Sequence, residues 1–196
     1  MAAALILASA SPRRRELLTQ AGIAFEVLPS DVPEVPRPGE VAEAFAQRAA
    51  REKALQIAAQ RPGTYVLGAD TVVAVDDLIF GKPVDPDDAR RMLRALSGRT
   101  HRVLTAVALV EPNGELQEIV VYSEVEFQAL SPEAIEAYLL TGEPFDKAGA
   151  YAVQGIGGQF VAQVRGSLSN VIGLPMEDVT ALLRRRVPTV LSGARA

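Results

Sequence analysis

Asp70 and Thr71 interrupt an otherwise apolar, strand-like segment, VLGADTVVAV (66–75). A buried carboxylate is costly unless it is paired with a cation or binds a metal ion. Asp70 is therefore a candidate metal ligand or a general base that activates water. The structural alternative is that Asp70 caps a bulge or pairs with Lys53. Gly68, two residues earlier, leaves room for a close approach to the strand.

Lys53 stands at the centre of the apolar face of a helix predicted over about 40–60. The residues that share this face are Ala46, Ala49, Ala50 and Ile57. A lysine in such a place either extends its ammonium past the apolar face into water or points at a buried anion or carboxylate. Both interpretations are open from the residues alone.

Arg13, Arg14 and Arg15 open a helix that should begin after the N-cap Ser11 and end at Gly22. Cations in the first turn of a helix are unfavourable by about 0.3–1 kcal/mol each, because the N-terminus carries partial positive charge. The helical period places Arg14 in the buried stripe, Arg13 at its edge and Arg15 toward solvent. An anion bound at the helix start would make these charges favourable, so we prefer an anion site to a solvated charge run.

Other candidate ligands lie in loops. Lys82, between a glycine and a proline in FGKPVDP, suits a phosphate, although a surface lysine is the ordinary case. The glycine-rich segment DKAGAYAVQGIGGQF (146–160) matches no P-loop or dinucleotide fingerprint. The amide of Gln154 within it could pair with the edge of a nucleobase. His101, the only histidine, is expected to be structural. Several cations around an internal carboxylate fit phosphoryl chemistry on a nucleotide, with a divalent metal offsetting the phosphate charge.

Composition limits the classes of protein. The 196 residues include no cysteine, which excludes disulfides and thiolate chemistry and fits a cytoplasmic location. The net charge of −4 argues against general nucleic-acid binding. No apolar run approaches the roughly 20 residues that span a bilayer, so we expect no membrane association.

The order of the predicted elements favours an α/β domain with a mixed sheet. An N-terminal strand precedes the arginine helix, and a proline-rich loop (29–39) precedes the helix over 40–60. The elements that follow are a strand over 64–75, a helix from about Asp85, a hairpin around EPNGEL (111–116), a helix capped by Ser131, a strand over 158–166 and a last helix over 175–186.

Seven segments in this order closely resemble the Maf proteins, which are nucleoside triphosphate pyrophosphatases. They are LASASPRRRELL, REKA, LGADTVV, GKP, MLRALSGRTHRVLTAV, DKAGAYAVQG and GSLSNVIGLP, within residues 5–182. The resemblance implies a single domain over 1–196 with an elongated mixed β-sheet flanked by helices, two lobes and a central cleft, similar to inosine triphosphate pyrophosphatases. It implies hydrolysis between the α and β phosphates with Mg²⁺ or Mn²⁺, and a homodimer.

The resemblance also implies roles for individual residues. Asp70 would be the catalytic acceptor and, with Glu34, a metal ligand. Phosphate-side positions would be Ser9, Arg14, Lys53 and Lys82, and positions associated with substrate choice would be Arg13, Thr71 and Gln154. Asp-Thr at 70–71 and Gln-Gly at 154–155 match the branch that acts on dTTP and UTP, and we include modified pyrimidine nucleotides among the expected substrates. Two alternatives stay open, a 7-methyl-GTP or other purine pyrophosphatase and a non-catalytic nucleotide-binding regulator of septum formation.

Overall fold

The computed structural model describes residues 5–187. The strands are β1 (Leu5–Leu7), β2 (Glu26–Val27), β3 (Tyr65–Val75), β4 (Leu78–Phe80), β5 (Thr100–Val110), β6 (Leu116–Phe127) and β7 (Val161–Arg165). The α-helices are α1 (Pro12–Gln20), α2 (Ala42–Gln60), α3 (Pro86–Leu96), α4 (Pro132–Leu139), α5 (Leu168–Ile172) and α6 (Met176–Arg186). Three short 3₁₀ turns, η1 (Glu143–Asp146), η2 (Ala148–Ala150) and η3 (Ile156–Phe160), lie between α4 and β7.

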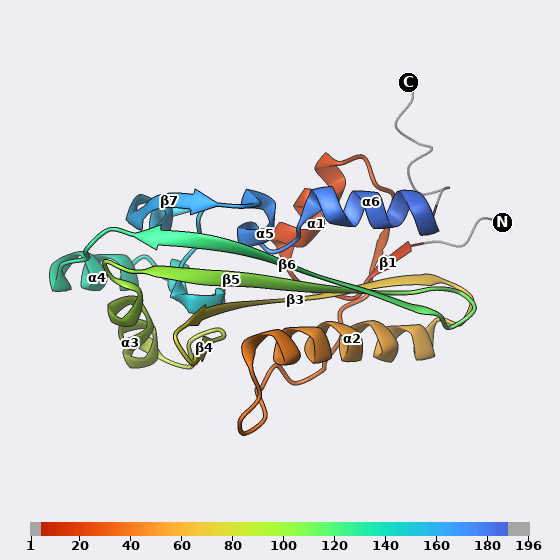
Figure 1. Cartoon of the computed structure of the whole chain (residues 1–196), viewed down its shortest axis with the longest axis horizontal. Coiled ribbons are helices and arrows are strands. Elements are labelled where there is room, and N and C mark those ends of the chain that lie inside the picture. Colours follow the sequence, from red (N-terminus) through yellow and green to blue (C-terminus); the bar gives the residue numbers. More distant parts are fainter. Residues whose placement is uncertain (1–4, 188–196) are drawn as a thin grey trace. The chain divides into compact units, whose positions relative to one another are not determined.

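The described strands form one sheet in the order β2-β1-β3-β5-β6-β7, with β4 paired to β3 (Figure 1). β1 pairs in parallel with both β2 and β3, whereas β4 and β7 pair antiparallel with their neighbours. The predicted mixed sheet with flanking helices is therefore confirmed.

The described residues divide into two compact units. The first holds 5–70, 105–121 and 173–187, and the second holds 71–104 and 122–172. Each of the long strands β3, β5 and β6 contributes residues to both units. The predicted cleft and the single domain over 1–196, which extends past the described residues at both ends, stay predictions.

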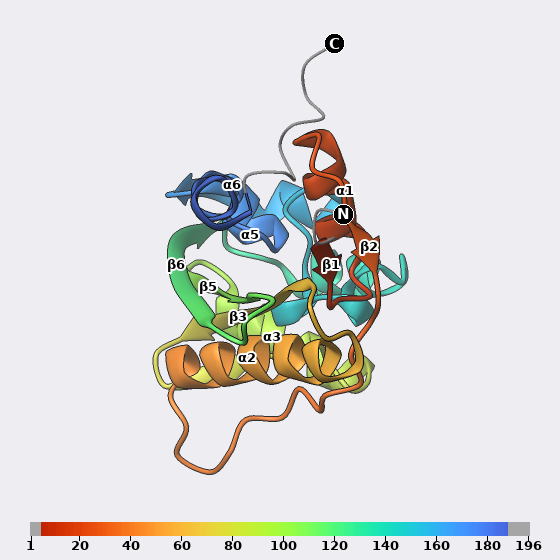
Figure 2. The ribbon, with the colours of Figure 1, turned by 90° about the vertical axis from the view of Figure 1, so that its right-hand side faces the viewer.

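In the first unit, α2 covers one face of the sheet, and α1 and α6 cover the other (Figure 2). Alternate residues of a strand point to opposite faces. Leu67 and Ala69 accordingly join the apolar cluster that includes Leu18 of α1 and Leu183 of α6. Gly68, between them, lies against the backbone of α2. Asp70 therefore shares the face of Gly68, toward α2.

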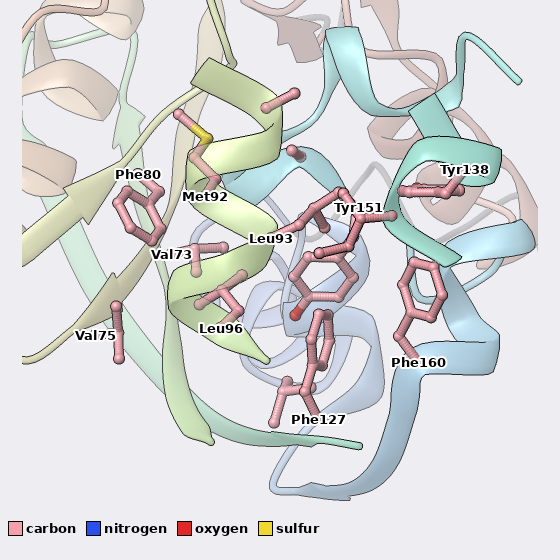
Figure 3. Close-up of a cluster of buried hydrophobic side chains, with 14 of the residues drawn as sticks. Val73, Val75, Phe80, Met92, Leu93, Leu96, Phe127, Tyr138, Tyr151 and Phe160 are labelled. Atoms are coloured by element: carbon pink, nitrogen blue, oxygen red, sulfur yellow. The ribbon is translucent and has the colours of Figure 1, made fainter. Parts of the chain in front are cut away.

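The second unit is built around an aromatic and aliphatic cluster from α3, α4, the strands and the segment of 3₁₀ turns, drawn in Figure 3. His101 is buried at its edge, where its Nε2 lies 2.8 Å from the hydroxyl of Tyr151 and its ring packs edge-on against Phe127. Its Nδ1 has no hydrogen-bond partner among the described residues. The structural role expected for His101 is thus confirmed.

The pH dependence of unfolding tests whether His101 folds in its neutral form. Burial lowers the pKa of His101 from 6.5 to about 4, so the unfolded chain binds protons preferentially between these values. Stability that is present above pH 6.5 is expected to fall by roughly 3 kcal/mol as the pH decreases toward 4. His101→Asn should remove this part of the pH dependence in urea denaturation. If the free energy of unfolding depends on pH equally in the variant and the wild type, His101 does not fold in its neutral form with a lowered pKa.

The expected helix stops and caps are present. Ser11 and Ser131 accept hydrogen bonds from the backbone at the starts of α1 and α4, and Gly22 and Gly142 adopt φ values of 67° and 75°. The strand expected over 158–166 is wrong at its start. Gly158 belongs to η3, and β7 begins only at Val161.

The short elements β2, β4 and α5, of two to five residues, have too little periodicity to be predicted. No helix among residues 5–187 combines the length and the apolar character that a membrane crossing requires.

Candidate functional site

Lys53 joins two carboxylates within the first unit. Its Nζ donates to Oδ1 of Asp70 at 2.6 Å and to Oε1 of Glu34 at 2.7 Å. Lys53 and Asp70 are 4% and 5% exposed, whereas the Glu34 side chain is 41% exposed. Lys53 thus points at a buried carboxylate, and the predicted structural pairing with Asp70 is present. One ammonium between two carboxylates leaves this group with a formal charge of −1.

Small residues bring Lys53 close to β3. A Cβ added to Gly68 would collide with the carbonyl oxygen of Ala50 and the backbone nitrogen of Ala54, so the α2 backbone passes directly over this glycine. Short alanine side chains on the buried face of α2 permit that approach. The close approach expected at Gly68 is therefore made by α2.

The proline-rich loop that carries Glu34 is attached to α2 by Arg48. The guanidinium of Arg48 donates to both carboxylate oxygens of Glu40 at 2.7 Å, to Glu52 at 3.2 Å and to the carbonyl of Val35 at 3.1 Å. The hydrogen bonds that Glu40 accepts from Arg48 and from the backbone N–H of Arg37 lower its pKa to about 2. Arg48, five residues before Lys53 on α2, therefore holds Val35, the residue next to Glu34.

The start of α1 is fixed by Arg14 and Ser9. The Arg14 side chain donates to the carbonyls of Gly173 at 2.9 Å and Ala69 at 2.8 Å, and to Oγ of Ser9 at 3.1 Å. Ser9 Oγ also accepts from the backbone N–H of Ser11 at 3.2 Å. Arg14 thus has a structural role in holding β3 and the segment before α6. Its predicted role at a phosphate stays a prediction.

Burial has the largest influence on the pKa values of Asp70 and Arg14. Desolvation raises the pKa of Asp70, and the charges of Lys53 and Arg14 oppose this shift. Desolvation likewise lowers the pKa of Arg14, while Asp70 and Glu34 oppose the shift. A carboxylate with a raised pKa is a stronger proton acceptor than an ordinary surface aspartate.

The predicted site residues fall into two groups. Ser9, Arg13, Arg14, Glu34, Lys53 and Asp70 belong to the first unit, and Thr71, Lys82 and Gln154 belong to the second. The order of burial in α1 is as expected, with Arg14 buried, Arg13 half-buried and Arg15 exposed. Thr71 is half-buried on β3, and Lys82 and Gln154 are exposed.

Arg48 and Glu40 were not among the predicted residues. Arg48 lies on the face of α2 opposite Lys53, where an arginine is usually solvated, and Glu40 precedes the helix. Their side chains are only 15% and 10% exposed. No sequence period links position 40 to position 48, so only the fold reveals the pair.

Comparison with known proteins agrees with this architecture. The family model described as Maf-like protein matches residues 4–186. A dTTP/UTP pyrophosphatase from Anaeromyxobacter dehalogenans is 54% identical over 94% of this chain and 95% of its own length. The dTTP/UTP pyrophosphatase of Myxococcus xanthus is 54% identical over 92% of this chain and 91% of its own length.

Among solved structures, a HAM1 protein from Coxiella burnetii shares the fold, with a TM-score of 0.51 over 93% of this chain and 99% of that one, at 16% identity. The family match over residues 4–186 and the two relatives at 54% identity lead to one conclusion. The chain belongs to the Maf family.

Proposed function

We propose that this protein hydrolyses dTTP and UTP between the α and β phosphates, releasing a nucleoside monophosphate and pyrophosphate. The observation that carries the proposal is the identity above 50%, over more than 90% of the chain, to relatives named dTTP/UTP pyrophosphatase. The buried pair of Lys53 and Asp70 supports the proposal, because it offers a cation for phosphate and a carboxylate that can accept a proton. The start of α1 is near this pair, since Arg14 donates to the carbonyl of Ala69, the residue before Asp70.

The donor set fits a divalent metal that is held mainly by substrate. Residues 5–187 contain no group of three or more histidine, cysteine, aspartate or glutamate side chains placed to hold a metal ion. Mg²⁺ typically takes one or two carboxylates and completes its shell with water and substrate phosphates. Asp70 and Glu34, brought together on Lys53, are two such carboxylates. When bound there, Mg²⁺ or Mn²⁺ would offset the negative charge of the triphosphate.

The residues of the chain divide the chemical work. Asp70 takes a proton from the water whose oxygen forms the new bond to the α-phosphorus. The bond from that phosphorus to the bridging oxygen breaks, and pyrophosphate leaves with both electrons of the bond. Lys53, Arg13, Arg14 and Lys82 stabilise the phosphate charge, with Ser9 as a further phosphate contact.

Thr71, Gln154 and Arg13 are assigned to substrate choice in this proposal. The neutral amide of Gln154 matches the mixed donor and acceptor edge of uracil or thymine. We place the reaction in the cytoplasm, in keeping with a sequence without cysteine, and include the homodimer implied by the resemblance.

A nucleotide panel tests the proposal. Pyrophosphate release is measured with dTTP, UTP, CTP, GTP and 7-methyl-GTP, each with Mg²⁺ and with Mn²⁺. The expected result is the highest kcat/KM with dTTP and UTP. A preference for 7-methyl-GTP would replace the pyrimidine assignment, and no release from any nucleotide would favour the non-catalytic regulator.

A further inference from the structure

The turn that carries Gln154 is held by one carboxylate, that of Glu143. Glu143 Oε1 accepts from the backbone N–H of Gly157 at 2.9 Å and from the hydroxyl of Tyr138 at 2.8 Å. Its Oε2 accepts from the backbone N–H of Ile156 at 2.9 Å. All of these residues belong to the second unit. The carboxylate therefore ties α4 to the segment just after Gln154.

Glycines let the turn close around this carboxylate. A Cβ added to Gly155 would collide with the carboxylate of Glu143, and one added to Gly157 would collide with the hydroxyl of Tyr138. A Cβ on Gly158 would in turn lie 2.5 Å from the carbonyl oxygen of Val153. The glycine-rich composition of the segment thus serves a tight turn around Glu143.

The hydrogen-bonding pattern favours an ionised carboxylate. All three groups around Glu143 are donors, and a carboxylate is an acceptor at both oxygens. Burial is the largest single influence and opposes ionisation, but the hydrogen bonds from Gly157, Ile156 and Tyr138 and the charge of Lys147 together lower the pKa of Glu143. A glutamine would place an NH₂ group against at least one N–H or O–H donor, so a neutral isostere cannot reproduce the pattern.

Buried aromatic side chains support this turn, whereas the side chain of Gln154 that it carries is exposed. Tyr138 is buried and packs edge-on against Phe160, the last residue of η3. Gln154 is exposed, two residues before the first amide that Glu143 binds. A rigid backbone under an exposed amide is the arrangement expected for a side chain that must present its donor and acceptor in one fixed orientation.

We propose that Glu143, supported by Tyr138, is a positioning residue that fixes the Gln154 turn (residues 153–160) and so sets the selectivity for the nucleobase. This inference rests on the proposed function, in which Gln154 contacts the base. Glu143 acts through the turn and touches neither the phosphates nor the reacting atoms.

The test compares wild type, Glu143→Gln and Tyr138→Phe, with Glu126→Gln as the matched surface control on β6. Hydrogen exchange is followed at the amides of Ile156 and Gly157. Steady-state kinetics are measured with UTP and CTP, and tripolyphosphate, which has no base, is titrated by calorimetry.

In Glu143→Gln, the two amides should exchange at least about tenfold faster, because they lose an ionised acceptor. The KM for UTP should rise roughly tenfold and the UTP/CTP ratio of kcat/KM should fall, whereas kcat should change less than about threefold. Tripolyphosphate affinity should stay at the wild-type value. Tyr138→Phe should show the same changes at smaller amplitude, and Glu126→Gln should show none of them.

Three results would overturn the inference: unchanged exchange at Ile156 and Gly157, unchanged nucleotide selectivity, or an equal loss of affinity for UTP and tripolyphosphate, which would indicate general damage. If the wild type hydrolyses no nucleotide, the proposed function fails. The exchange measurement then still decides whether Glu143 holds the turn.

Discussion

Asp70→Asn is expected to lower kcat for pyrophosphate release from UTP by about 10²- to 10⁴-fold, the contribution of a general base. Asparagine has the same shape, and its amide oxygen can still accept the hydrogen bond that Lys53 donates at 2.6 Å. It cannot take a proton from water, and it is a poorer ligand for a divalent cation. The loss should therefore lie in turnover, and the variant should remain folded.

The matched control for this substitution is Asp77→Asn. Asp77 is exposed and lies in the turn between β3 and β4, so its neutralisation should leave kcat within about twofold of the wild type. Thermal unfolding of all three proteins shows whether the fold is intact. Turnover of a folded Asp70→Asn variant within threefold of the wild type would refute the role given to Asp70.

Lys53→Met is expected to have the largest effect on stability, about 3–5 kcal/mol lost at pH 8, the usual cost of removing one member of a buried ion pair. The cause is Asp70, which is 5% exposed and would be left without its ammonium partner. Glu34 is 41% exposed and can be solvated, so its contribution should be small.

The stability lost in Lys53→Met should depend on pH, because it comes from the ionised form of Asp70. Without Lys53, the raised pKa of Asp70 in the folded state should rise further, because the opposing charge is gone. A group whose folded-state pKa lies above its unfolded value costs stability as the pH rises through the folded pKa. The loss in Lys53→Met should thus be larger at pH 8 than at pH 5.

Urea denaturation of a double-mutant cycle measures the coupling. Lys53→Met combined with Asp70→Asn should recover much of the stability that the single Lys53→Met loses, while remaining inactive. A single variant that loses less than about 1 kcal/mol at pH 8, or a double variant that recovers none of the loss, would contradict the paired-charge account.

The features that sequence predicted best are those set by local periodicity. The helical period alone separates Arg14 from Arg15 and places Lys53 on the buried face of α2, and both placements agree with the structure. Ser11 as an N-cap and Gly22 as a stop follow from short-range hydrogen bonding and from backbone freedom at glycine.

The contacts that sequence could not predict join distant parts of the chain. Neither the pairing of Glu34 with Lys53 nor that of Arg14 with the carbonyl of Gly173 follows from any period, because loops and strand ends bring these groups together. The segment around Gly158 alternates like a strand, yet its tight packing against Val153 makes it a turn. Periodicity carries no information about such tertiary contacts.

The position of bond cleavage tests the central proposal most directly. UTP is hydrolysed in H₂¹⁸O with Mg²⁺, and the products are separated and analysed by mass spectrometry. Water attack at the α-phosphorus, with Asp70 as the proton acceptor, predicts UMP that carries one ¹⁸O and pyrophosphate that carries none. Formation of UDP and inorganic phosphate, or ¹⁸O in pyrophosphate instead of UMP, would contradict it.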